Sequence, residues 1–175
     1  DPVEAAQPVQ ITGRVTDAAV TFIRAHRDEP FFCYLPHAFV HHPRATRPTF
    51  MQQTKNPDKR TGGQIEEVDW SVGQILDTLR DLGMTWVRTD MWWGSVEQAP
   101  GVYDFSQWDQ ELSALESRNM RGIFLLNYGN DLYGGGPPTT PDAIDAYGGY
   151  AQAAAEFFAG RDVVFELWNE PDIGF

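Results

Sequence analysis

An Asn-Glu-Pro corner at residues 169–171 follows the mostly apolar run at residues 163–167. The run predicts a strand, and Pro171 is expected to end it because proline has no N–H to donate. Alternate side chains of a strand share a face, so Glu166, Trp168 and Glu170 are predicted to point one way. A carboxylate at the carboxyl end of such a strand lies where α/β barrels hold their chemistry. Glu170 is therefore the first candidate for proton transfer.

A second strand is predicted at residues 85–93, and its sequence places a cation among aromatic side chains. Arg88 shares a face of this strand with Trp86, Asp90 and Trp92. The strand resembles the second barrel strand of clan A glycosidases, in which an arginine at this place supports the catalytic carboxylates through charge and hydrogen bonds. Arg88 could equally pair with Glu166 or Asp90 for stability, and the sequence leaves both interpretations open.

These motifs resemble the retaining glycoside hydrolases of clan A, and within that clan the family 39-like enzymes. The loop from Glu97 to Ser106 matches their pattern E-x-x-x-G-x-Y-D-F-S. Its second half reads Gly101-Val102-Tyr103-Asp104-Phe105-Ser106. The resemblance implies that Glu170 is the general acid/base of an enzyme acting on a β-linked saccharide, with Asn169 contacting the substrate. It also implies a secreted or periplasmic protein.

Further side chains are predicted to bind the saccharide, by resemblance or because aromatic rings stack on sugars. With Asn169, the predicted substrate-binding residues are Arg88, Trp93, Tyr128, Asn130 and Trp168. Trp92 could stack in the same way. For the tryptophans the alternative is ordinary core packing, which we expect more for Trp168 than for Trp93.

A retaining glycosidase needs two carboxylates about 5–5.5 Å apart. The resemblance puts the second on a seventh strand, and no Glu in residues 83–175 matches it. Glu166 lies four residues before Glu170, or ~13 Å along an extended strand, which is too far. We therefore expect weak or no hydrolysis. The alternative is a non-catalytic, self-associating protein with at most weak carbohydrate binding.

Residues 15–82 resemble a different family, the sulfatases of the alkaline-phosphatase superfamily. The matching stretches are PFFCYLPHAFVHHP and IEEVDWSVGQILDTLRDLG. The resemblance implies that His41 descends from a residue that contacts the sulfate ester. The formylglycine motif, Cys-x-Pro-Ser-Arg or Ser-x-Pro-Ser-Arg, is absent from the sequence, as are the Asp-Asn-Gly calcium ligands. We therefore do not expect sulfatase activity.

Three histidines, His37, His41 and His42, suggest a metal site because imidazoles four residues apart can share an ion. No carboxylate or Cys follows at a ligand-like spacing. A solvated, proline-rich turn is the favoured interpretation, so neither a metal nor another cofactor is predicted.

The elements that must position these residues alternate along the chain. We expect helices at residues 16–28, 65–80, 106–119 and 141–158, of which the first, third and fourth are capped by Thr16, Ser106 and Thr140. Strands are expected at residues 31–35, 85–93, 123–126 and 163–168. This order predicts an α/β fold of parallel βαβ units. The whole would be half of a (β/α)₈ barrel, with the sulfatase-like strand and helix in place of its first unit. The segments 1–82 and 83–175 are expected to form one folded unit.

Composition limits the partners. The chain has 175 residues and a net charge of −12, which argues against nucleic acid or an anionic membrane and suits a neutral or cationic substrate. No apolar run is long enough for a membrane helix, and the single cysteine, Cys33, permits no internal disulfide. Open edges at the 31–35 and 163–168 strands predict self-association, most simply a two-fold dimer.

Overall fold

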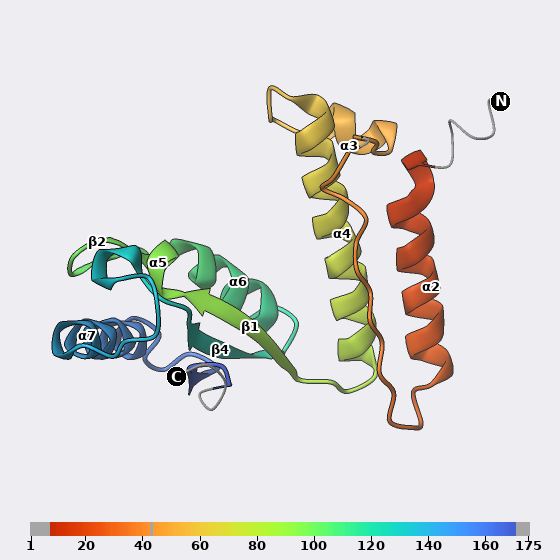
Figure 1. The fold of residues 1–175 in the computed structure, drawn as a ribbon. Coiled ribbons are helices and arrows are strands. Elements are labelled where there is room, and N and C mark those ends of the chain that lie inside the picture. The colour runs from red at the N-terminus through yellow and green to blue at the C-terminus, as the bar shows by residue number, and fades with distance from the viewer. Residues whose placement is uncertain (1–7, 43, 171–175) are drawn as a thin grey trace. The chain divides into compact units, whose positions relative to one another are not determined.

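The computed structural model describes residues 8–42 and 44–170 (Figure 1). The chain separates into two compact units, Asp1–Met84 and Thr85–Phe175. This division falls within two residues of the predicted junction. That the two segments form one folded unit stays a prediction, and the two units are taken one at a time below.

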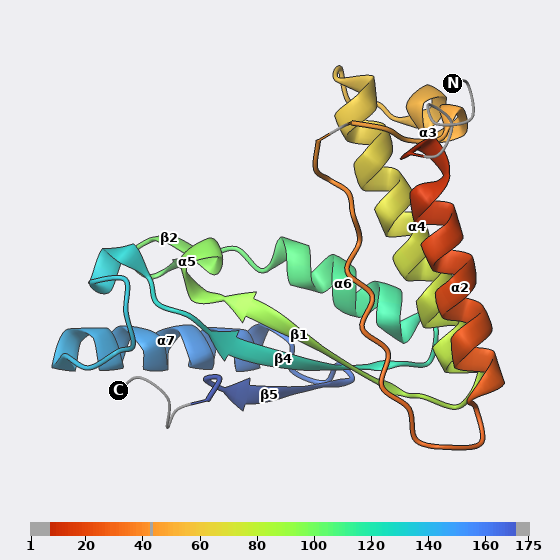
Figure 2. The same ribbon diagram turned by 45° about the vertical axis from the view of Figure 1, so that its right-hand side comes forward.

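The first unit is helical. It contains a short 3₁₀ turn η1 (Pro8–Gln10) and the helices α2 (Ile11–Ala25), α3 (Pro48–Gln53) and α4 (Lys59–Asp81). Helices α2 and α4 lie side by side (Figure 2). Helix α4 begins six residues earlier than predicted, with the Asp58 carboxylate accepting hydrogen bonds from the backbone N–H groups of Arg60 and Thr61. Gly83 follows in the left-handed region, φ 87°, as expected after a helix end.

The predicted strand at residues 31–35 is wrong. These residues form neither helix nor strand, and no backbone hydrogen bond joins them to another described residue. A strand needs a neighbour to complete its ladder of hydrogen bonds, and the described part of this unit offers none. The predicted replacement of the first barrel strand therefore does not form.

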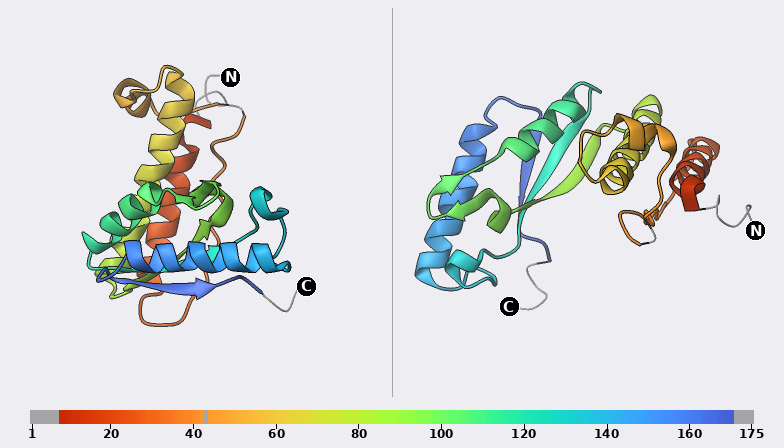
Figure 3. Two further views of the ribbon diagram at one scale, coloured as in Figure 1. Left: turned by 90° about the vertical axis from the view of Figure 1, so that its left-hand side faces the viewer. Right: turned by 90° about the horizontal axis from the view of Figure 1, so that it is seen from above.

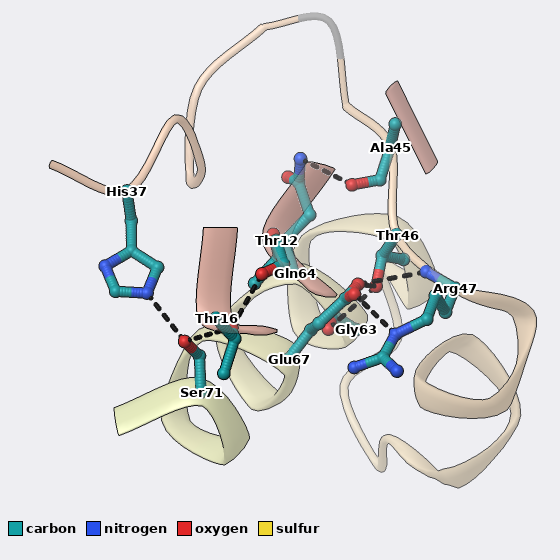
Figure 4. A network of polar contacts seen from close by, with 10 residues as sticks. All are labelled: Thr12, Thr16, His37, Ala45, Thr46, Arg47, Gly63, Gln64, Glu67 and Ser71. Atoms are coloured by element: carbon teal, nitrogen blue, oxygen red, sulfur yellow. Dashed lines mark hydrogen bonds and ion pairs between the residues drawn. The ribbon is translucent and has the colours of Figure 1, made fainter. Parts of the chain in front are cut away.

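The contact between α2 and α4 contains a buried polar pair. Thr16 was expected to start its helix, but it lies inside α2 and its Oγ1 donates to the Thr12 carbonyl at 2.6 Å. The same Oγ1 lies 2.6 Å from the buried Oγ of Ser71 on α4, and His37 Nε2 lies 2.9 Å from that Ser71 oxygen (Figure 4). The hydroxyl pair therefore joins the helices where an apolar pair would be usual.

A second polar group of this unit centres on Glu67, whose side chain is buried. Its carboxylate accepts hydrogen bonds from Thr46 Oγ1 at 2.6 Å, Arg47 N at 3.0 Å and Arg47 Nε at 2.7 Å (Figure 4). The Arg47 guanidinium also lies over the rings of Phe50 and Trp70. Glu67 thus fixes the loop before α3 to the middle of α4.

The second unit is built on a parallel sheet. Its strands β1 (Trp86–Trp92), β4 (Arg121–Asn127) and β5 (Val163–Leu167) lie in the order β1-β4-β5. The connections contain α5 (Trp93–Val96), a small antiparallel pair β2 (Glu97–Ala99) and β3 (Val102–Tyr103), α6 (Ser106–Glu116), η2 (Asp131–Tyr133) and α7 (Pro141–Phe157). The α/β class with parallel βαβ units is confirmed.

Helices α6 and α7 pack on the same face of this sheet (Figure 3). The core between them and the strands is large and aromatic. Its members are Met91, Trp93, Val96, Phe105, Trp108, Leu112, Phe124, Leu126, Tyr150, Ala154 and Phe158. By alternation, Arg88 on β1 and Glu166 on β5 lie on the opposite face, and both side chains are partly exposed.

The Glu111 carboxyl on α6 lies in a partly buried environment that disfavours its negative charge. Burial raises the pKa of Glu111 above its ordinary value near 4.5, and a hydrogen bond with Thr89 opposes this only in part. A carboxyl whose pKa is higher in the folded state than in the unfolded state contributes stability at pH values below its unfolded pKa. This contribution is lost as the pH rises through its folded pKa.

We therefore expect Glu111→Gln to raise the urea midpoint of unfolding at pH 7, with a smaller gain at pH 4. Urea unfolding at both pH values measures this. Glu156→Gln on the exposed side of α7 is the matched control. A Glu111→Gln midpoint at or below wild type at pH 7 contradicts the argument.

Candidate functional site

A pocket of about 520 Å³ opens at the carboxyl ends of β1 and β4. Its size is that of a small-molecule site. Its walls come from the segments that follow the two strands. They are formed by Trp92, Gly94, Ser95, Glu97, Gln98, Tyr128, Gly129, Asn130, Asp131 and Leu132.

Two exposed aromatic rings form one side of this pocket. Trp92 ends β1 with 52% of its surface exposed, and Tyr128 follows β4 with 47% exposed. Their ring centroids are 5.3 Å apart at an interplanar angle of 74°. Tyr128 has φ 60°, in the left-handed region that non-glycine residues seldom adopt. Exposed aromatic faces at a strand end can stack on the apolar face of a sugar ring.

The floor of the pocket is held by Glu97, whose side chain is 1% exposed. Its carboxylate accepts hydrogen bonds from Trp93 Nε1 at 2.6 Å, Gly101 N at 2.7 Å and Tyr133 Oη at 2.8 Å. The hydrogen bond to the carboxylate raises the pKa of Tyr133 to about 12. Asn130 Nδ2 donates to the Glu97 carbonyl at 2.8 Å. This one residue therefore fixes both loops of the pocket.

The loop after β4 also depends on close packing of its backbone. A Cβ at Gly129 would stand 2.2 Å from the carbonyl oxygen of Gly135, which no side chain tolerates. Asn130 Oδ1 accepts from Leu132 N at 2.9 Å and starts the η2 turn. The Tyr128 ring is thus carried on a loop whose path its glycines and Asn130 determine.

Next to this pocket along the sheet, the face opposite the helices carries an ion pair. Arg88 Nε and Nη2 donate to the two Glu166 oxygens at 2.7 and 3.1 Å, and Nη2 also donates to Asn169 Oδ1 at 3.1 Å. Hydrogen bonding to Glu166 raises the pKa of Arg88, and hydrogen bonding to Arg88 lowers the pKa of Glu166. Arg88 therefore joins β1, β5 and the Asn169 corner.

The structure differs from the prediction at that corner. Strand β5 ends at Leu167, and Trp168 and Glu170 have φ of 60° and 46°. Strand alternation therefore does not extend to Glu170, and the distance expected from an extended chain does not apply. Glu170 is exposed, after the carboxyl end of β5. The predicted role of Pro171 lies outside the described residues.

The predicted substrate-binding residues are found in four different settings. Tyr128 and Asn130 line the pocket, while Arg88 and Asn169 meet outside its walls. Trp168 is half-buried and its ring contacts Tyr147 with centroids 6.0 Å apart. Trp93 is 0% exposed in the core, so its ring cannot stack on a sugar and we leave it out of the site.

Sequence reasoning missed several pocket residues. Trp92 was weighed but not chosen, and Ser95, Gln98 and Asp131 were not considered. The signal for Trp92 is its place as the last outward residue of β1. Asp131 carries no such signal, because only the η2 turn brings it to the pocket.

Metal binding finds no support in residues 8–42 and 44–170. No three His, Cys, Asp or Glu side chains gather there as ligands. The imidazole of His37 is bonded to Ser71, and the rings of His41 and His42 contact each other edge to face. Within the same residues, no helix has both the length and the apolar character needed to cross a membrane.

Comparison with known proteins gives two kinds of relative, and no family model matches the chain. By sequence it is 37% identical over 110 residues to an N-acetylgalactosamine-6-O-sulfatase of Bacteroides thetaiotaomicron, covering 63% of this chain and 20% of that protein. It is 38% identical over 74 residues to the steryl-sulfatase of Rattus norvegicus, covering 42% of this chain and 12% of that protein.

By structure the chain is similar to a family 39 glycoside hydrolase from the gut symbiont Bacteroides cellulosilyticus WH2. The TM-score is 0.54 at 28% sequence identity, over 61% of this chain and 23% of that chain. Both resemblances seen in the sequence are confirmed. The sequence has sulfatase homologues over part of its length, and its structural neighbour is a glycoside hydrolase, as expected of a chimera. The chain spans less than a quarter of the length of each of these relatives.

Proposed function

We propose that the second unit is the saccharide-binding part of a glycoside hydrolase-type site, with Glu170 as its general acid/base. The observation that carries this is the pocket beside the exposed rings of Trp92 and Tyr128, which form one of its sides at the carboxyl edge of the sheet. Glu170 follows β5 at the same edge. The likeness to a family 39 glycoside hydrolase supports the choice of a saccharide.

In this proposal each residue has a definite task. Trp92 and Tyr128 stack on a sugar ring, and Asn169 donates its amide to a sugar hydroxyl while Arg88 holds its oxygen. Glu170 gives its proton to the oxygen of the leaving group as the glycosidic bond breaks, and a water molecule adds to the sugar carbon and releases a proton to the solvent. Because the Glu170 carboxyl is exposed in this structure, the bound saccharide itself would have to exclude water from the proton transfer.

Saccharide binding without hydrolysis is the second candidate. It is favoured by the ion pair, since the Glu166 carboxylate accepts two hydrogen bonds from Arg88 and is not free to attack a sugar carbon. The lowered pKa of Glu166 keeps that pair charged. We therefore expect any turnover by this chain to be orders of magnitude below that of a whole glycosidase.

Two other expectations concern sulfatase activity and self-association. The sulfatase homologues act on the substrates that their names state, but residues 1–175 hold no formylglycine motif, so we do not propose sulfatase activity. Self-association is proposed because, among the described residues, β1 and β5 have no strand on their outer sides.

The test of saccharide binding compares two tryptophans of one strand. Trp92→Ala should weaken the binding of a neutral β-linked oligosaccharide about tenfold, because a stacked ring contributes about 1 kcal/mol beyond its burial. Isothermal titration calorimetry measures the affinity. Trp86→Ala is the matched control, because Trp86 begins the same strand, shares its face and is also exposed. Equal losses in the two variants, or no binding by the wild type, contradict the proposal.

A further inference from the structure

The charges of the second unit are distributed unevenly. Residues 85–175 hold 14 acidic and 4 basic residues, a net charge of −10, and all four basic residues are arginines. Three of these, Arg118, Arg121 and Arg161, lie at the amino ends of β4 and β5 or just before them. The pocket is at the opposite, carboxyl edge.

The pocket itself has acidic walls. None of the described residues that line it is Lys, Arg or His, and two of them, Glu97 and Asp131, are carboxylic acids. Glu97 is buried and its oxygens are occupied. Asp131 is exposed at the first position of the η2 turn. Its carboxylate is therefore the charged group that a bound molecule meets.

The remaining arginine does not supply a positive charge to the pocket. Arg88 is absent from the pocket lining, and its guanidinium is bound by Glu166 and Asn169. An anionic group in the pocket would therefore face Asp131 with no cation opposite it. Like charges a few ångströms apart repel by about 1 kcal/mol or more even in a watery medium.

We infer that this pocket selects uncharged saccharides and rejects sulfated sugars and uronic acids. The inference rests on the proposed function and adds the class of sugar to it. Asp131 is the residue that determines the selectivity.

The experiment measures the binding of two matched oligosaccharides to the full chain by calorimetry. One is neutral, and the other is the same oligosaccharide carrying one sulfate or one uronate carboxyl. At low salt the neutral sugar should bind about tenfold tighter or more, and added salt should narrow this ratio because it screens the repulsion. Asp131→Asn should reduce the ratio several-fold, whereas Asp145→Asn on the exposed side of α7 should leave it unchanged.

The outcomes separate this inference from the proposed function. If the charged sugar binds as tightly as the neutral one, or tighter, the selectivity is refuted and the saccharide site stands. If Asp131→Asn leaves the ratio of the two affinities as it is in the wild type, the role of Asp131 is refuted. If neither sugar binds, the proposed function fails and this inference fails with it.

Discussion

Replacing Glu170 by Gln should lower whatever aryl β-glycoside hydrolysis the chain performs by a factor of about 10²–10⁴. The amide is close to the carboxyl in shape but has no proton of comparable acidity to give to the leaving oxygen. The substitution should leave folding intact, because Glu170 is exposed and follows the last strand. Rates at substrate saturation and below it separate this loss from a loss of binding.

The acidity of the leaving group makes this prediction specific. A strongly acidic phenol leaves without a proton, so the Glu170→Gln loss should be small for that substrate and large for a weakly acidic phenol. Glu156→Gln on α7 makes the same chemical change on an exposed helix surface and should alter neither rate. A loss that is equal for both phenols would show that Glu170 is not the proton donor.

The second large effect is expected at Glu97. Glu97→Ala should lower the free energy of unfolding by about 3 kcal/mol, because it leaves the buried indole N–H of Trp93 without an acceptor. The N–H of Gly101 and the phenol of Tyr133 lose the same acceptor but can turn to water. Urea unfolding followed by tryptophan fluorescence measures the loss.

Two further variants identify the cause. Glu97→Gln keeps one acceptor oxygen and removes the negative charge, so its loss should be smaller and the pKa of Tyr133 should fall from about 12 towards its ordinary value of 10.0. Spectroscopic titration of the phenol follows that pKa. Gln98→Ala, at the exposed next residue, should change stability little. An unchanged Tyr133 pKa in Glu97→Gln would contradict the role given to the carboxylate.

The second unit could be predicted from its sequence because local signals and tertiary packing agree there. The apolar run from Ile123 to Leu126 lies inside β4, and Thr140 caps α7 as expected, with Oγ1 accepting from Ala143 N at 3.3 Å. At α6 the expected Ser106 cap is wrong, because Asp104 Oδ1 accepts from the Ser106 N–H at 2.9 Å instead. The element was predicted correctly and only its cap was not.

The first unit was predicted less well because its signals depend on residues far away. Thr16 is typical of a helix start, but its hydroxyl finds Ser71, 55 residues along the chain, and the helix continues through it. Residues 31–35 have the composition of a buried strand, but a strand forms only beside another strand. The strand propensity of residues 31–35 could not show that no strand lies beside them among the described residues.

At the candidate site, the difference between Trp92 and Trp93 shows what the sequence prediction overlooked. The two are adjacent and chemically identical. Strand β1 ends at Trp92, and α5 begins at Trp93 and turns that ring into the core beside Tyr133 and Tyr150. Strand alternation already puts Trp92 on the face of Arg88 and Trp93 on the buried face of Met91, so the sequence held a signal against Trp93 that was not used. The Arg88–Glu166 pair was one of the alternatives left open, and it could be named because both residues lie within regular strands.

The polar contact between α2 and α4 has a consequence for how the first unit responds to temperature. Among its described residues, the buried apolar side chains are Ala19 and Ile23. The buried polar ones are Thr12, Thr16, Thr46, Thr54, Gln64, Glu67, Ser71 and Thr78. Exposing apolar surface raises the heat capacity and exposing polar surface lowers it. The heat-capacity change on unfolding this unit should therefore be small for its length, which makes its stability curve shallow from cold to warm.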